Sequence, residues 1–331
     1  MNCSKRWYTS TSGPTVKAET LVALGSFDGV HSGHRDLIAR TVSEAEKRGL
    51  IPAAAVFTLP PARFGTRDFE GILMEPAEKK EMLRSLGIRE ILPLDFAAVR
   101  DIEADIFVKE FLIGKLRAAG TVCGADFTFG KDRAGNAESL KGYFGDAAVV
   151  IDRTRHRSGD VSSSRIRKLL LSGDVLEASR LLLRPYALSG RVISGRGDGS
   201  RFGFPTLNIA PPRRLVCPAR GVYITLTELA GVTQPLPSVT DIGYAPTLDD
   251  SGKLRIESHI IDSLCPPDAG RLPPPGEDFD GVIRISFLDR LRDEMKFSSP
   301  AMLARRISAD SGIAAAYFGL RGTPHAPGAA E

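Results

Sequence analysis

The pattern of apolar segments changes once along this chain, near residue 184, and this change limits the folds that the sequence can form. Before it, short apolar runs alternate with amphipathic helical segments, which is typical of a parallel sheet covered by helices on both faces. After it, short segments rich in β-branched and aromatic residues follow one another without helices, which indicates a small antiparallel barrel or sandwich. We therefore predict two domains, residues 16–183 and 184–320, with flexible tails at 1–15 and 321–331.

The spacing of apolar residues predicts where the elements lie. The strands predicted in the first domain are Leu21–Leu24, Ala53–Phe57, Ile91–Leu94, Thr121–Cys123 and Val149–Ile151, and the helical segments are Gly33–Arg48, Glu78–Leu86, Phe107–Leu116 and Ser163–Leu183. In the second domain we predict strands at Leu188–Ile193, Gly221–Thr227, Leu254–Ile261 and Gly281–Phe287, and a helix at Pro300–Ala316. The stretch 265–280 is rich in Pro, Gly and Asp and is expected to form an exposed loop between two strands.

Composition restricts the class of protein. The 331 residues are 42% hydrophobic and 25% charged, with a net charge of +4, which is ordinary for a globular protein and does not indicate dedicated nucleic-acid binding. The four cysteines show no metal-ligand spacing. Residues 1–20 lack the apolar core of a signal peptide, and no apolar run approaches membrane-spanning length. We expect a cytoplasmic protein without nucleic-acid or membrane partners.

The segment Leu24–Ile38 carries the strongest motif of the first domain. A strand enters a glycine-containing turn, and a helix then begins around His31, Gly33 and His34 and ends at Gly49, a typical C-terminal cap. Residues three apart share a helix face, so both imidazoles are expected beside the free N–H groups of the first turn. This arrangement suits phosphate binding. The alternative is a plain strand-turn-helix unit with two surface histidines.

Two later segments of the first domain carry groups suited to phosphate. Residues 124–130, which include Asp126, form a glycine-framed loop after a strand, and this signal is weak alone. Ser162–Arg167 opens a helix with three serines and two arginines. Hydroxyls and guanidinium groups together suit a polyphosphate, although serines at a helix start are usually N-caps. A nucleotide transfer built from these groups would depend on positioning and charge stabilisation.

The second domain offers polar residues on predicted strands. Gly195–Gly199 follows a strand but precedes no helix, so it is not a dinucleotide-binding fingerprint. Thr206 and Asn208 are two residues apart and therefore lie on one face of a strand. Glu257 is the carboxylate within the strand Ile256–Ile260. An exposed residue on the wet face of the sheet is the alternative interpretation of Glu257.

These segments together resemble the bacterial bifunctional riboflavin kinase and FAD synthetase family. The matches occur in order along both domains: Gly25–His34, Gly124–Gly130, Ser162–Arg167, Gly190–Asn208, Gly221–Tyr223, Ile242–Gly243 with Pro246–Thr247, Glu257–His259 and Leu291–Phe297. The resemblance implies an α/β nucleotidyltransferase-like N-terminal domain with a Rossmann-like parallel sheet. It also implies a C-terminal six-stranded antiparallel β-barrel with a terminal helix.

For the N-terminal domain the resemblance implies FMN adenylylation, in which FMN and ATP give FAD and pyrophosphate. His31 and His34 would hold the ATP phosphates and stabilise charge while the FMN phosphate attacks, and Asp126 would contact the flavin side. The other ATP- and phosphate-binding residues that the resemblance implies are Gly25, Phe27, Asp28, Gly33, Ser163, Ser164, Arg165 and Arg167.

For the C-terminal domain the resemblance implies phosphorylation of riboflavin to FMN by ATP with Mg²⁺. Thr206 and Asn208 would position the metal, and Glu257 would take the proton of the ribityl 5′-hydroxyl, a role that suits a partly buried carboxylate because burial raises its pKa. Arg292 would reach the flavin. The phosphate loop would contain Gly195, Gly197, Gly199 and Gly203. ATP is then the co-substrate, FMN the intermediate and FAD the product.

The sequence departs from the family pattern at several positions. Leu59-Pro60-Pro61 stands where the family has Pro-His-Pro, so we expect a weakened synthetase. Ser164 replaces a Thr and keeps the hydroxyl, while Leu207 replaces the Ala between Thr and Asn. Asp241 replaces the Asn before Ile-Gly, and the stretch 265–280 replaces a short Asp-Phe segment.

Three functions compete on this evidence. The chain is a bifunctional enzyme, an enzyme with only its kinase half active, or a non-catalytic paralogue that binds flavin or nucleotide. The last is disfavoured by the retained polar residues His31, His34, Thr206, Asn208 and Glu257.

Overall fold

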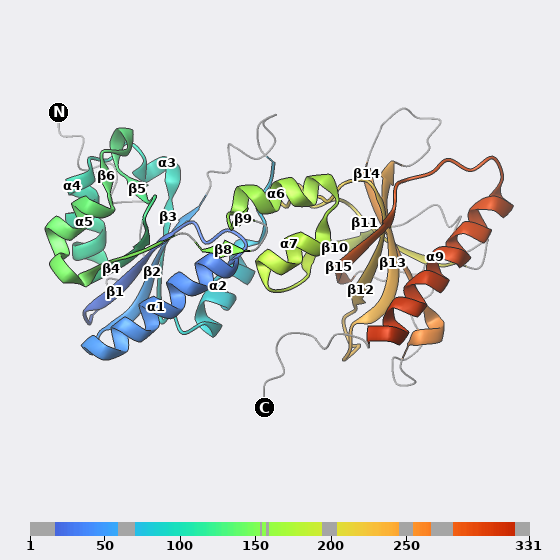
Figure 1. Ribbon diagram of the computed structural model, residues 1–331, viewed down its shortest axis with the longest axis horizontal. Helices are drawn as coiled ribbons and strands as arrows, with labels where there is room; N and C mark the ends of the chain where they lie inside the picture. The colour runs from blue at the N-terminus through green and yellow to red at the C-terminus, as the bar shows by residue number, and fades with distance from the viewer. Residues whose placement is uncertain are drawn as a thin grey trace. The chain divides into compact units, whose positions relative to one another are not determined.

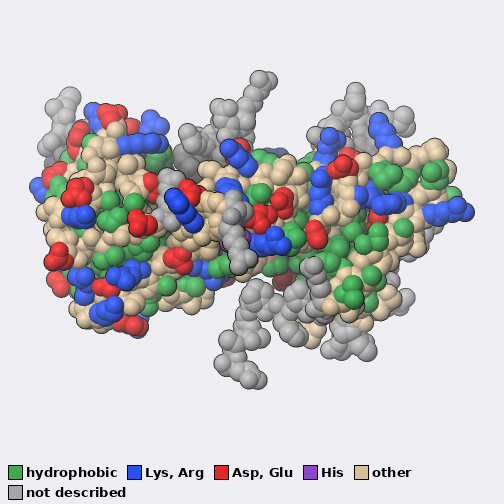
Figure 2. Space-filling model, viewed as in Figure 1, with side chains coloured by type: hydrophobic (Ala, Val, Ile, Leu, Met, Phe, Trp, Pro, Cys, Tyr) green, Lys and Arg blue, Asp and Glu red, His purple; other side chains and the backbone are tan. Residues whose placement is uncertain are grey.

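The structure is a computed structural model, and the residues that it describes are 17–58, 70–152, 154–156, 159–193, 204–244, 254–265 and 281–321. Contacts between residues divide the chain into two compact units, Met1–Ser163 and Ser164–Glu331. Each unit has its own sheet and its own buried core. Figure 2 shows basic and acidic side chains interspersed on the face in view. No helix within the described ranges is both long enough and apolar enough to cross a membrane.

The first unit is built on a five-stranded sheet in the order β3-β2-β1-β4-β7 (Figure 1). All neighbouring strands pair in parallel. The strands are β1 (Thr20–Gly25), β2 (Ile51–Thr58), β3 (Glu90–Asp95), β4 (Ala118–Gly124) and β7 (Ala148–Ile151). The predicted parallel α/β sheet is therefore confirmed, and every strand predicted for it is present.

Helices cover both faces of this sheet. They are α1 (Ser32–Arg48), α2 (Pro76–Ser85), α3 (Phe96–Val99), α4 (Ala104–Ile106) and α5 (Ala137–Phe144). Leu21 and Ala23 face a core that includes residues of α1 and α2, whereas Val22 and Leu24 face a second core on the opposite side. Alternation with period two places the apolar side chains of β1 in both cores, so β1 is buried on both faces.

The predicted helix Phe107–Leu116 is present but is wound as a π-helix over Phe107–Lys115. Its buried side chains are Phe107, Val108, Phe111 and Leu112. A spacing of four residues between buried pairs fits an α-helix and a π-helix equally, so the apolar pattern could not distinguish the two windings.

Two short hairpins complete the first unit. They are β5 (Thr128–Phe129) with β6 (Gly135–Asn136), and β8 (Arg155–His156) with β9 (Gly159–Asp160). The first follows β4 and the second follows β7, so both lie after carboxyl ends of sheet strands.

The helical region predicted over Ser163–Leu183 is two helices, α6 (Ser163–Ser172) and α7 (Val175–Leu182). Gly173 has φ +84°, which ends α6, and the Asp174 carboxylate accepts a hydrogen bond from the Glu177 N–H at 3.0 Å and caps α7. The sequence predicts both helices in the first domain. In the structure α7 packs on strands of the second unit, and the Ala219 N–H donates to the Leu170 carbonyl at 2.9 Å.

The second unit is a closed antiparallel barrel in the order β10-β11-β14-β13-β12-β15. Its strands are β10 (Tyr186–Ile193), β11 (Thr206–Ile209), β12 (Gly221–Glu228), β13 (Leu236–Tyr244), β14 (Leu254–Ile260) and β15 (Val282–Arg292). The terminal helix α9 (Pro300–Arg321) extends beyond the predicted end at Ala316. The six-stranded barrel with a terminal helix is therefore confirmed.

The interior of the barrel is partly polar. Hydroxyl groups from β12, β13 and β14 bond to one another at 2.7–3.2 Å and are completely buried: Thr225, Thr227, Ser238, Thr240 and Ser258. Outward-facing apolar residues such as Val222 and Ile224 pack instead with Ala314 and Phe318 of α9. The pattern did not predict β13, because polar residues occur on both of its faces.

Candidate active sites

The loop between β1 and α1 lies at the switch point of the sheet, where the chain has added β2 and β3 on one side of β1 and then adds β4 and β7 on the other. β1 pairs with β2 on one side and with β4 on the other, and ligands of open α/β sheets bind at such a switch point. Within the loop Phe27, Gly29 and Val30 have φ values of +48°, +79° and +41°. A left-handed conformation is costly for bulky or β-branched residues and is found where a functional loop needs a fixed shape.

His31 and His34 lie together at the start of α1. Their rings are stacked with centroids 3.6 Å apart and planes 15° apart. The His34 N–H donates to His31 Nδ1 at 3.3 Å, so a neutral His31 carries its proton on Nε2. Burial, then the nearby His31 and Lys79, hold the pKa of His34 well below its usual range. His34 is therefore neutral near pH 7, and both rings lie near a helix N-terminus, as the i, i+3 spacing predicts.

Most of the other residues predicted for this loop hold the histidines in position. The Phe27 ring is fully buried and contacts the His34 ring edge-on, with centroids 5.3 Å apart. Asp28 Oδ1 accepts a hydrogen bond from the Leu73 N–H at 2.9 Å, and Ser163 Oγ donates to the Asp28 carbonyl at 2.9 Å. Both contacts fix the turn that precedes α1.

Two glycines of this segment allow neighbouring side chains to pack directly against the backbone. A Cβ on Gly25 would lie 3.2 Å from the Phe27 ring, and a Cβ on Gly33 would lie 3.3 Å from Thr154 Oγ1. Thr154 Oγ1 in turn donates to Asp36 Oδ2 at 2.6 Å, which ties the segment after β7 to α1. Both glycines therefore sit where a side chain would press on the loop.

Lys79 was not predicted as a site residue. It lies on α2 and is buried, and its Nζ donates to the Ser26 carbonyl at 2.9 Å. The sequence predicts α2 as a helix but contains no local signal that one of its lysines reaches the β1–α1 loop. This long-range contact adds an ammonium group to the site.

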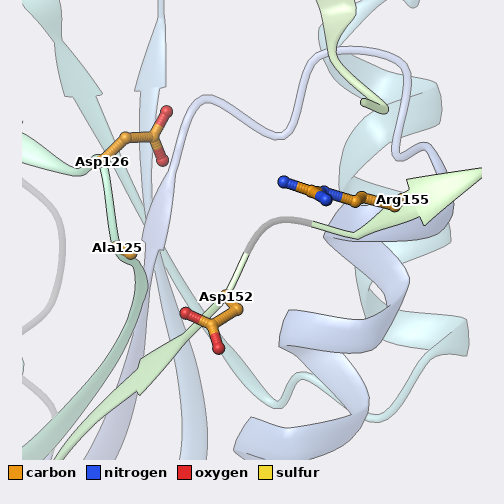
Figure 3. A pocket seen from close by; sticks show the side chains of 4 residues that line it. All are labelled: Ala125, Asp126, Asp152 and Arg155. Carbon is orange, nitrogen blue, oxygen red and sulfur yellow. The ribbon is translucent and has the colours of Figure 1, made fainter. Parts of the chain in front are cut away.

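A cavity of about 470 Å³ opens near the carboxyl ends of β4 and β7 (Figure 3). It is lined by Ala125, Asp126, Asp152 and Arg155, and Figure 3 shows Asp126 and Arg155 extending toward the space between them. Asp126 was predicted from the sequence, whereas Asp152 and Arg155 were not. Asp152 and Arg155 both follow β7 and belong to none of the motifs identified in the sequence.

The remaining predicted residues of this site lie in helix α6 or outside the described ranges. Ser164, Arg165 and Arg167 follow Ser163 directly on α6, and Arg165 Nη2 lies 3.6 Å from Glu177 Oε1. Leu59-Pro60-Pro61 lies outside the described residues.

In the barrel, five residues form one row of cross-strand neighbours on the outer face. In order across the strands they are Asn208, Glu257, Asp241, Val222 and Arg292. Thr206 lies two residues before Asn208 and is paired with His259. The register therefore brings the predicted residues Asn208 and Glu257 directly opposite each other, as a shared site requires.

Asn208 is buried, with an exposed fraction of 6%. Its Nδ2 lies 3.5 Å from the Thr206 carbonyl, and its Oδ1 has no hydrogen-bond partner among the described residues. A buried carbonyl oxygen without a partner is costly in a finished fold, and a water, an ion or a ligand is the kind of group that satisfies it. Across the described part of the chain no group of three or more His, Cys, Asp or Glu is suited to hold a metal.

Arg292 is held by the terminal helix. Its Nε and Nη2 donate to Asp310 Oδ2 at 2.9 and 2.7 Å, and Asp310 is 1% exposed. The Arg292 Nη1 donates to the Asp293 carbonyl at 2.9 Å. The orientation of this guanidinium group therefore depends on α9.

Several predicted features of the barrel lie outside the described residues. They are Gly195, Gly197, Gly199 and Gly203 of the predicted phosphate loop, Pro246-Thr247, and all of the stretch 265–280 except Cys265.

Both halves of the chain match known families. A family model for FAD synthetase matches residues 14–165, and one for riboflavin kinase matches residues 182–318. The bifunctional riboflavin kinase/FMN adenylyltransferase of Pseudomonas fluorescens is 31% identical over 303 residues, 89% of this chain and 92% of that protein. The protein of the same name from Bacillus subtilis (strain 168) is 31% identical over 309 residues, 91% of this chain and 93% of its own length.

A solved structure also resembles the chain over nearly its whole length. It is described as a macrolide-efflux protein from Streptococcus pneumoniae, is 29% identical, and aligns with a TM-score of 0.79 over 92% of this chain and 96% of that one. The likeness therefore includes both the α/β unit and the barrel.

Proposed function

This chain belongs to the family of bifunctional riboflavin kinases/FMN adenylyltransferases, and from that premise we propose how its residues carry the two reactions of FAD biosynthesis. The chain is an enzyme of FAD biosynthesis. Riboflavin is phosphorylated by ATP to FMN, and FMN is then adenylylated to FAD with release of pyrophosphate. We assign adenylyl transfer to residues 16–183 and phosphorylation to residues 184–320, with the cytoplasm as the compartment that supplies ATP.

For adenylyl transfer, the observation that carries the assignment is the stacked pair His31 and His34 at the N-terminus of α1. An oxygen of the FMN phosphate attacks the α-phosphorus of ATP, and the bond to the bridging oxygen of pyrophosphate breaks. We propose that His31 Nε2–H and the first N–H groups of α1 donate to the phosphate oxygens as charge shifts onto them. An imidazole N–H suits this role because it is a fixed hydrogen-bond donor aimed at the phosphate oxygens.

The supporting residues divide into two groups in this proposal. Phe27, Asp28 and Ser163 fix the turn through the contacts described above, and Gly25 and Gly33 leave the room that the turn needs. We assign Ser164, Arg165 and Arg167 to the β- and γ-phosphates, since guanidinium groups bind phosphate in bidentate fashion.

The flavin side of this site is assigned to the cavity after β4 and β7. We propose that Asp126 orients the flavin or the nucleotide there through its carboxylate. The volume of the cavity and its charged lining residues suit part of a nucleotide.

For phosphorylation, the assignment depends on Glu257 and Asn208 being directly opposite each other. We propose that Glu257 accepts the proton of the ribityl 5′-hydroxyl while that oxygen attacks the γ-phosphorus and ADP leaves. General-base catalysis by a positioned carboxylate typically contributes about 10²–10⁴-fold. Arg292, held by Asp310, is assigned to the flavin side, and Gly195, Gly197, Gly199 and Gly203 to the phosphate loop.

The kinase reaction requires Mg²⁺ in this proposal, and the residues present fit it. Thr206 and Asn208 would supply oxygen ligands, and the unpartnered Asn208 Oδ1 is the kind of atom that a hard cation satisfies. Mg²⁺ usually takes few protein ligands and completes its shell with phosphates and water. When bound, the ion would offset the charge of the ATP phosphates.

One assay separates the bifunctional enzyme from its two alternatives. The full chain is incubated with riboflavin, ATP and Mg²⁺, and the flavins are separated by chromatography. FAD supports both assignments, FMN alone would mean that only the kinase half is active, and unchanged riboflavin would mean a non-catalytic binding protein.

A further inference from the structure

His259 lies directly beside the residues proposed to hold Mg²⁺ in the kinase half. In the antiparallel pair β11 and β14 it is the cross-strand partner of Thr206, just as Glu257 is the partner of Asn208. Side chains two residues apart on a strand share a face, so these four lie together on the outer face of the barrel. Directly opposite residues in such a pair have Cβ atoms about 4.5–5.5 Å apart. His259 is therefore an immediate neighbour of Thr206, although neither proposed reaction uses its imidazole.

The imidazole of His259 contacts the two residues that lead into β11. Its Nδ1 lies 3.0 Å from the Pro205 carbonyl oxygen. A carbonyl oxygen only accepts hydrogen bonds, so Nδ1 carries the hydrogen and donates it. The ring also meets the Phe204 ring edge-on, with centroids 5.3 Å apart and planes 79° apart. Two different contacts from one side chain thus hold the segment that enters the strand.

The start of β11 needs this support because its backbone offers few hydrogen bonds of its own. Proline has no N–H, so Pro205 cannot donate to a neighbouring strand. The strand is short, Thr206–Ile209, and Thr206 is its first residue. The ends of an element are the parts that open most readily. The hydrogen bond from His259 to Pro205 therefore restrains the point at which Thr206 enters the site.

This hydrogen bond is available whether or not the ring is charged. Nδ1 carries a hydrogen in the imidazolium ion and in one of the two neutral tautomers. Bonding to a carbonyl selects that tautomer and orients the ring. The contribution of His259 is therefore one of geometry rather than of proton transfer.

We propose that His259 is a positioning residue of the kinase half, which fixes the entry of β11 through its Nδ1–H and thereby holds Thr206 where Mg²⁺ and the ATP phosphates bind. This inference rests on the proposed role of Thr206 as a ligand. Loss of the hydrogen bond leaves both proposed ligands and the proposed base in the chain and loosens only the position of Thr206. A looser ligand weakens binding of the metal–nucleotide complex, so the effect belongs in KM rather than in kcat.

Two amide variants separate the hydrogen bond from the ring. The Asn amide can occupy the place of Nδ1 and donate to Pro205, whereas the Gln amide reaches the place of Nε2, away from that carbonyl. Both variants lose the contact with Phe204. In His259→Gln the KM for Mg²⁺·ATP in riboflavin phosphorylation should rise about 3–10-fold, the range for one neutral hydrogen bond, with kcat unchanged. In His259→Asn the rise should be less than about twofold.

The matched control is His156→Gln, the same exchange at an exposed histidine on β8 of the first unit. This variant should keep the kinase KM of the unchanged protein. Adenylylation of supplied FMN should be unaffected in both His259 variants. An unchanged KM in His259→Gln, or an equal rise in His259→Gln and His259→Asn, would overturn the inference. Failure of the metal assignment is recognised separately, because Thr206→Val would then keep the KM of the unchanged protein.

A measurement independent of activity completes the test. In the full chain labelled with ¹⁵N at threonine, without metal or nucleotide, the NMR order parameter of the Thr206 amide should be about 0.85 in the unchanged protein and in His259→Asn. In His259→Gln it should fall toward about 0.6. The amides of Thr225 and Thr240, on β12 and β13, should keep their values in all three proteins, which shows that the barrel is folded. If the Thr206 order parameter is the same in all three, His259 does not hold the entry of β11 and the inference fails.

Discussion

Asn208 and Glu257 are paired across β11 and β14, which places an unpartnered amide oxygen directly opposite a carboxylate on the outer face of the barrel. Removing the carboxylate should therefore affect only the kinase reaction. We expect Glu257→Gln to slow FMN formation by about 10²–10⁴-fold, because the amide keeps the shape but accepts no proton. Adenylylation of supplied FMN should be unchanged. Kinase turnover equal to that of the unchanged protein would show that the base lies elsewhere.

His31→Ala should have the reciprocal effect. Loss of the imidazole removes a preorganised donor and also the acceptor of the hydrogen bond from the His34 backbone N–H. FAD formation from FMN should therefore fall by about 10²-fold or more. Riboflavin phosphorylation should stay normal, and the Glu257→Gln variant provides the crossed control. Equal loss of both activities would indicate damage to folding, which a circular dichroism spectrum would reveal.

Lys79→Met tests a residue that the sequence does not point to. The hydrogen bond of its ammonium group to the Ser26 carbonyl holds the β1–α1 loop, and hydrogen bonds to charged groups contribute about 1.5–3 kcal/mol. We expect FAD formation to fall about tenfold or more. NMR titration should also show the pKa of His34 moving upward, since Lys79 helps to lower it. Lys80→Met, at the exposed neighbouring position, should change neither quantity.

The point at which the chain is cut should decide the stability of the isolated kinase half. A fragment of residues 164–331 keeps α7, whose Val175, Ala178, Leu181 and Leu182 are completely buried. A fragment of residues 184–331 loses them, and each buried aliphatic side chain of Leu or Val size contributes about 1.5–3 kcal/mol. Both fragments should phosphorylate riboflavin, with the shorter one melting at a lower temperature in calorimetry. Equal melting temperatures would show that the helices do not stabilise the barrel.

Asp241 should make the stability of the protein depend on pH. Burial, followed by the nearby Glu294 and Glu257, raises the pKa of this carboxyl to about 7 in the folded chain, against an ordinary value of 3.8. As pH rises from about 4 to 7 the unfolded chain loses this proton while the folded chain retains it, so the free energy of unfolding decreases. The melting temperature should fall between pH 5 and pH 8 in both proteins, but the fall should be smaller in Asp241→Asn by about 2–4 °C or more. An equal fall in the two proteins would argue against the raised pKa of Asp241.

Local signals in the sequence predicted those parts of the fold that depend on neighbouring residues. Apolar runs located β1 and β2, and Gly49, with φ +66°, ends α1 where a left-handed cap was expected. The break at Gly173 was missed, because apolar spacing continues on both sides of it. The strand β13 was missed because its inward face carries hydroxyls, which become suitable for a core only when β12 and β14 supply partners.

The site shows the same division between local and distant information. The pairing of His31 with His34 follows from their spacing on one helix, and the shared face of Thr206 and Asn208 follows from their spacing on one strand. Lys79 and Arg155 reach the first unit's site from separate elements, and no spacing rule links them to the histidines. Strand register, which the sequence does not state, is what makes Asp241 a neighbour of Glu257.

The buried hydroxyls inside the barrel have a consequence for the chemistry on its outside. Side chains alternate between the two faces of a strand, so a slip of β14 by one residue would turn Glu257 inward and Ser258 outward. Such a slip would also separate Ser258 from Thr227 and Thr240 and leave buried hydroxyls without partners, which costs about 1–3 kcal/mol for each group. The buried hydroxyl network thus fixes the register of β14. Through that register, the interior of the barrel determines which side chains lie side by side on the outer face, where the substrates bind.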